Sequence, residues 1–154
     1  MTNQYEFTND EWDTITLAPG LIGEAIARAA DSGLIGELRE SRSIVASMAS
    51  AAADNPAKHL IDASGSVDHK DRMARLSGGA NPSESLATAA VDVAGEVASI
   101  LAAKATPEET AGYTNWLLEI ANSVASTAKE NGERISPPEA ALIGRLSLAL
   151  ETDG

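Results

Sequence analysis

Residues 81–104 read NPSESLATAAVDVAGEVASILAAK, and this stretch decides the fold class. From Leu86 to Leu101 its apolar residues recur alternately four and three positions apart, which is the spacing of one buried stripe along an α-helix. A proline at the first helical position and Lys104 in the last turn mark the two ends of this helix. The stretch therefore predicts a long amphipathic helix, and the same features recur along the chain.

Residues 81–84 also combine a capping side chain with a carboxylate in the first turn. Three more helix starts have the same combination. In the segment Phe7–Trp12, Thr8 supplies the hydroxyl, Glu11 supplies the carboxylate, and the two terminal aromatic residues are spaced to pack across the first turn. Thr106–Glu109 and Ser136–Glu139 add a proline at the first helical position. Their glutamates are predicted to cap helices rather than to catalyse a reaction.

The first half of the chain is less regular than the second. Pro19 and Gly20 predict a break or a kink in the first long helix. Between residues 56 and 79 the sequence predicts two short helices hinged at residues 64–66. The serine and glycines at 77–81 predict a flexible joint between the two halves.

Composition indicates the same fold class. The chain of 154 residues has 44% apolar residues but only one Phe, two Trp and two Tyr. Much alanine with little aromatic or β-branched material favours closely packed helices over a sheet. We therefore expect an all-α single domain over residues 1–154, a helical bundle of six to eight helices with short polar tails at 1–6 and 151–154.

Charge and cysteine content narrow the functional classes. The 11 basic and 23 acidic residues give a formal net charge of −12, which disfavours nucleic-acid binding. No cysteine is present, so disulfides and cysteine-ligated metal sites are excluded. No basic leader and no uninterrupted apolar run of ~18 residues occurs, so we expect a cytoplasmic protein without a membrane span.

Sequence motifs for catalysis are missing. No Gly-x-Ser-x-Gly elbow, phosphate-binding Gly-rich loop or dinucleotide-binding fingerprint occurs, and we expect no enzyme activity. The two histidines are His59 and His69. A turn at Gly65 could fold Asp68 and His69 back toward His59 and Asp62 to form a metal site. The neighbouring Lys and Arg side chains instead favour an ordinary solvated helix surface.

One apolar stripe combines the two aromatic residues of the second half, Tyr113 and Trp116, with Leu117 and Ile120. Its helical spacing is typical of the core-facing side of a helix. The alternative is that these side chains line an interhelical pocket for a small apolar ligand.

Two acidic glycine turns share a design. Residues 31–37 read DSGLIGE, and residues 130–139 read ENGERISPPE. In each, Asp or Asn is followed by Gly and then by an isolated Ile, and an acidic residue opens the next helix. Neither turn fits an EF-hand, because aligning the isoleucine with the eighth loop position leaves no oxygen ligand at the first.

This pattern resembles the tellurite-resistance protein B-like (TerB-like) group of small all-helical bacterial proteins. The resemblance rests on Ala30, Asp31, Gly33 and Ile35 in the first half, and on Asn131, Gly132, Ile135, Ser136 and Glu139 in the second. It implies a bundle with pseudo-repeated halves and acidic residues that bind a divalent cation. The candidate cation ligands are Asp31, Glu37, Glu130, Glu133 and Glu139.

Three functions follow as expectations. The resemblance implies a non-enzymatic interaction or stress-response component that has a protein partner and binds a divalent cation weakly at its acidic helix joins. The aromatic stripe alternatively predicts a carrier of a small apolar ligand. The net charge alternatively predicts an acidic adaptor, or an immunity-like binder, of a basic protein.

Overall fold

The computed structural model describes residues 4–29, 45–50, 52–66, 69–76, 78, 82–130 and 137–151. No strand occurs in these ranges, and the helices found there confirm the prediction of an all-α bundle of six to eight helices. Both acidic glycine turns fall wholly or largely outside the described residues, so the pseudo-repeat of the two halves stays a prediction. The joint predicted at 77–81 also lies outside them, except for Gly78.

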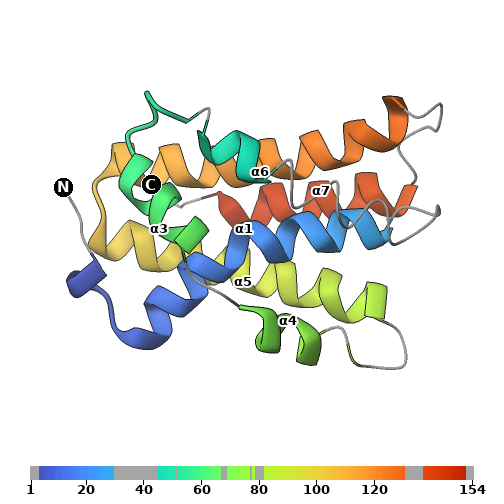
Figure 1. Ribbon diagram of the computed structural model, residues 1–154, viewed down its shortest axis with the longest axis horizontal. Coiled ribbons are helices and arrows are strands. Elements are labelled where there is room, and N and C mark those ends of the chain that lie inside the picture. Colours follow the sequence, from blue (N-terminus) through green and yellow to red (C-terminus); the bar gives the residue numbers. More distant parts are fainter. Residues whose placement is uncertain are drawn as a thin grey trace.

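Four long helices form the body of the molecule and run roughly along its long axis (Figure 1). They are α1 (Asn9–Ala29), α5 (Pro82–Lys104), α6 (Pro107–Glu130) and α7 (Pro137–Leu150). Three shorter elements are the 3-10 helix η1 (Gln4–Glu6), α3 (Lys58–Ser66) and α4 (Lys70–Leu76), and residues 45–50 are also helical. The prediction of two short helices in the middle of the chain is confirmed. The hinge was predicted at 64–66, but these residues form the last turn of α3, which ends at Ser66, and α4 begins at Lys70.

The core lies between α1, α5, α6 and α7. α5 packs against all three of the other long helices, and α3 and α4 pack on the outside, on α1 and α5 respectively. Large buried side chains such as Ile22, Leu101 and Leu117 fill the centre. Buried alanines on α1, α5 and α6 let the helix axes approach closely, which is why so few aromatic residues are sufficient.

α5 is the one described helix that is long and apolar enough to cross a membrane. This holds for the segment Glu84–Lys104 by length and composition alone, and 39% of its most apolar stretch is buried inside the bundle. The core helix of a soluble protein meets the same criterion, so α5 is weak evidence of a membrane span. The segment is consistent with the soluble protein that we expected, while its cytoplasmic location stays a prediction.

The start of α1 has the predicted capping box. The backbone N–H of Thr8 donates to Oε1 of Glu11 at 2.8 Å, and the backbone N–H of Glu11 donates to Oγ1 of Thr8 at 3.1 Å. The rings of Phe7 and Trp12 pack with centroids 5.8 Å apart. Lys104 at the end of α5 pairs with Glu11. The Lys104 side chain and then the Thr8 backbone N–H hold the pKa of Glu11 below its ordinary value.

We expect replacement of Thr8 by alanine to lower the free energy of unfolding by about 0.5–2 kcal/mol, because it leaves a backbone N–H of the first turn without its cap. Urea unfolding monitored by circular dichroism measures this. The control is Thr88→Ala at an exposed position inside α5, which should stay within about 0.5 kcal/mol of the wild type. Equal losses in both variants would contradict the capping role.

Pro19 does not break α1. The helix runs without interruption from Asn9 to Ala29 with Pro19 buried inside it, and the blue ribbon bends between its darker and its lighter part (Figure 1). Proline has no N–H, so the carbonyl of Ile15, four residues earlier, loses its helical donor. The hydroxyl of Tyr113 on α6 takes that place and donates to the Ile15 carbonyl at 2.7 Å. The helix is therefore not broken at Pro19. The carbonyl that the proline leaves without a helical donor instead forms a hydrogen bond that links α1 to α6.

Candidate functional site

Of the five candidate cation ligands, Glu139 is the one whose side chain the structure describes. Asp31, Glu37 and Glu133 lie outside the described residues, and so does the side chain of Glu130. Glu139 is the third residue of α7 and is only 1% exposed. Its carboxylate lies in the first turn, where the helix dipole favours negative charge. Within the described part of the chain no group of three or more His, Asp or Glu side chains is arranged to hold a metal ion.

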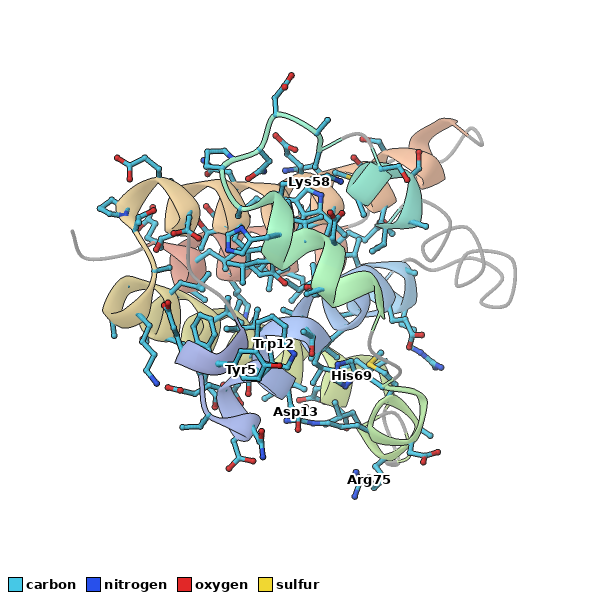
Figure 2. All side chains as sticks on the ribbon, turned by 60° about the vertical axis from the view of Figure 1, so that its left-hand side comes forward. Tyr5, Trp12, Asp13, Lys58, His69 and Arg75 are labelled. Carbon is cyan, nitrogen blue, oxygen red and sulfur yellow. The ribbon has the colours of Figure 1, made fainter. Side chains whose placement is uncertain are left out.

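The two histidines have different partners. Nε2 of His59 on α3 lies 2.9 Å from Oε2 of Glu109 on α6. Nε2 of His69, which precedes α4, lies 2.8 Å from Oγ1 of Thr16 on α1. Lys58 at the start of α3 and His69 are well separated in Figure 2. The described residues do not form the metal site considered from the sequence, because His59 faces Glu109 of α6 whereas His69 faces Thr16 of α1.

The aromatic stripe lies in the core. Tyr113, Leu117 and Ile120 are fully buried, Trp116 is 2% exposed, and the Tyr113 and Trp116 rings are 5.6 Å apart. Nε1 of Trp116 is buried without a hydrogen-bond partner among the described residues. None of the four side chains lines a hollow on the surface of the described residues. They pack against other core residues as an ordinary buried stripe does.

The hydroxyl of Tyr113 is part of a buried polar chain that joins three helices. Oγ of Ser64 on α3 lies 2.7 Å from it, and the same Oγ lies 2.8 Å from the carbonyl of Leu60. With the bond to Ile15 there are three short contacts for two hydroxyl hydrogens, so at least one contact is without a hydrogen at any moment. Burial raises the pKa of Tyr113, so the phenol stays protonated and serves as a donor.

A shallow acidic groove lies between α1 and α5 on the surface. One hollow is lined from α1 and α5 by Asp10, Glu11, Thr14, Val91, Asp92, Gly95, Glu96, Ser99 and Ile100. A second hollow, along α5, is lined by Glu84, Ser85, Thr88, Ala89 and Asp92. Asp92 lines both, so we treat the two hollows as one acidic groove.

Among the described residues no Lys or Arg lines the acidic groove, although Lys104 pairs with Glu11 at its edge. The carboxylates of Asp10, Glu84, Asp92 and Glu96 are on exposed residues. The remaining lining residues are mostly small, and a Cβ placed on Gly95 would meet no atom within 4 Å. The groove is therefore negative, open and smooth. Sequence reasoning found the net charge but not this location, because it depends on how α1 packs on α5.

The fold and this surface define a class, an all-α helical bundle with an acidic groove between α1 and α5. This chain has no significant match to a protein-family model, a curated protein or a solved structure. The comparisons therefore neither support nor oppose the TerB-like resemblance, which stays a prediction.

Proposed function

We propose that this chain is a non-enzymatic binding protein whose acidic groove docks a basic segment of a protein partner. The observation that carries the proposal is a groove with four exposed carboxylates and, in the part of the chain that the structure describes, no basic side chain in its lining. Of the three functions expected from the sequence, the acidic adaptor is the one with a described surface behind it. An interaction or stress-response role of the TerB-like kind is compatible with such docking and remains part of the proposal.

Electrostatics favours a cationic partner at this surface. Carboxylates in a concave surface add their fields, and complementary charge speeds association and disfavours partners of the same sign. Each exposed ion pair adds only about 0.2–1 kcal/mol, so several must form together to give useful affinity. The small side chains around Gly95 allow the backbone of a docked segment to come close to α5.

The proposal predicts that the double variant Asp92→Asn, Glu96→Gln binds a labelled Lys- and Arg-rich peptide about fivefold to tenfold more weakly than the wild type, because two surface ion pairs are lost. Fluorescence anisotropy measures the dissociation constant. Binding should also weaken strongly at 0.5 M salt, where the screening length is roughly 4 Å.

The matched control is the double variant Glu108→Gln, Glu119→Gln on α6, which changes the net charge by the same amount at exposed positions outside the groove. We expect it to bind the peptide nearly as tightly as the wild type. Equal weakening in both double variants would show that only the net charge acts, and would contradict docking in the groove. Gly95→Leu adds a steric test, because it fills the groove without a change in charge and should also weaken binding.

A further inference from the structure

One carboxylate of the acidic groove already binds a positive charge. Nζ of Lys104, in the last turn of α5, forms an ion pair with Oε1 of Glu11, in the first turn of α1. α1 and α5 pack together and run in opposite directions, so these two turns meet at one end of the groove (Figure 1). Glu11 lines this end together with Ile100, which lies about one helical turn before Lys104. An ammonium group of the chain itself therefore occupies the end of the groove.

The other carboxylates of the same hollow differ from Glu11. Asp10, Asp92 and Glu96 are exposed, and none of them forms an ion pair with a basic side chain among the described residues. The side chain of Glu11 is only 25% exposed and is paired. Three open acceptors thus lie beside one that is already occupied.

Glu11 does not depend on Lys104 for its position. Its Oε1 also accepts a hydrogen bond from the backbone N–H of Thr8 at 2.8 Å, and its own backbone N–H donates to Oγ1 of Thr8 at 3.1 Å. This capping box contains no atom of Lys104, so it stays complete when the lysine is replaced. The carboxylate would then remain in place, oriented to accept a cation from another molecule.

Lys104 can leave this contact at little cost. Its ammonium group lies at the end of a flexible four-carbon stem, and its side chain is 33% exposed. A lysine in the last turn of a helix keeps a favourable interaction with the helix dipole when it points elsewhere. A single pair of this exposure is also weak compared with several pairs formed together by a docked segment.

We propose that Lys104 is a built-in competitor for Glu11, which limits how tightly the acidic groove binds a Lys- and Arg-rich segment of a protein partner. While Lys104 is in place, it neutralises Glu11 and repels a partner's cation from this end of the groove. The docked segment therefore pairs with Asp10, Asp92 and Glu96, and reaches Glu11 only by displacing Lys104. This inference rests on the proposed function, because it concerns the regulation of the same groove.

The variant Lys104→Gln tests the competitor. We expect it to bind the labelled Lys- and Arg-rich peptide about threefold to fivefold more tightly than the wild type at low salt, because it frees one carboxylate and removes one like charge. Fluorescence anisotropy with the full-length proteins gives the dissociation constants, and circular dichroism checks that each variant is folded.

The matched control is Lys58→Gln on α3, outside the groove. Lys58 pairs with Asp62 at 2.7 Å, and its side chain is 34% exposed, close to the 33% of Lys104. The control changes the net charge by the same amount and should alter the affinity by less than about twofold. An equal gain in both variants would show that only the net charge acts, and would overturn the proposal.

A double variant tests whether the gain comes from Glu11. Glu11→Gln keeps a side chain that suits a capping box, so α1 should still start correctly. When Glu11→Gln is combined with Lys104→Gln, the freed acceptor is absent, and the affinity should return to within about twofold of the wild type. A gain that persists in the double variant would rule out competition for Glu11.

Failure of this inference can be told apart from failure of the proposed function. If the wild type binds the peptide and Lys104→Gln binds it equally tightly or more weakly, docking in the groove stands and the competitor is rejected. Lys104 would then be only a link between α1 and α5. If neither protein binds the peptide at low salt, the proposed function fails, and the competitor fails with it.

Discussion

Replacement of Tyr113 by phenylalanine is expected to lower the free energy of unfolding by about 1–3 kcal/mol, although it removes a single oxygen atom. The loss arises from groups left behind. The Ile15 carbonyl has no helical donor because Pro19 follows four residues later, and without Tyr113 it would be buried and unpaired. Urea unfolding followed by circular dichroism gives the change.

A control and a double variant make this prediction specific. Tyr5→Phe changes the same atom at a side chain that is 92% exposed, and it should change the free energy of unfolding by less than about 0.5 kcal/mol. Pro19→Ala restores an N–H four residues after Ile15, so Tyr113→Phe should cost less in that background, by at least about 0.5 kcal/mol. An equal cost of Tyr113→Phe with and without Pro19 would contradict the link between the proline and the tyrosine.

Gly112→Ala is expected to lower the free energy of unfolding by about 1–3 kcal/mol, even though alanine is the better helix former. A Cβ at this position would lie inside van der Waals contact of Oδ1 of Asn55 and would also crowd Pro56. The same Asn55 side chain accepts a hydrogen bond from the backbone N–H of Ala57 at 2.8 Å and donates one to the Gly112 carbonyl. The added methyl group must therefore displace Asn55 and the turn that leads into α3.

The control for Gly112→Ala is Gly144→Ala on the exposed side of α7, where a Cβ meets nothing within 4 Å. That variant should be neutral or should stabilise the protein by up to about 1 kcal/mol. In an Asn55→Ala background the methyl group at 112 has less to collide with, so Gly112→Ala should then cost less. If Gly112→Ala costs nothing, or costs the same in both backgrounds, close approach of Asn55 does not require this glycine.

Local signals in the sequence predicted the helices well. The capping box of Thr8 and Glu11, the staple of Phe7 and Trp12, and the box at Thr106 and Glu109 all have the expected partners. Each of these features involves residues three to five positions apart, so their geometry follows from a single helical turn. The all-α fold class could be predicted for the same reason, because it depends on these local helix signals.

Features that join distant segments could not be predicted in this way. Pro19 was read as a break or a kink because its missing N–H is a local defect, and the donor that compensates for it comes from α6, 98 residues from Ile15. His59 was considered with His69, its neighbour in sequence, but it faces Glu109. The acidic groove likewise combines Asp10 of α1 with Asp92 and Glu96 of α5. Long-range packing decides all three.

The most direct test of the proposed function is a two-dimensional amide NMR titration of the protein with the Lys- and Arg-rich peptide at low salt. The account predicts that the largest chemical-shift changes at saturation fall on groove residues, including Thr14, Asp92, Gly95 and Ser99. It also predicts that residues around the exposed Glu119 of α6 change little. Saturable binding with its largest changes around Glu119 or on α7, or no binding at low salt, would contradict it.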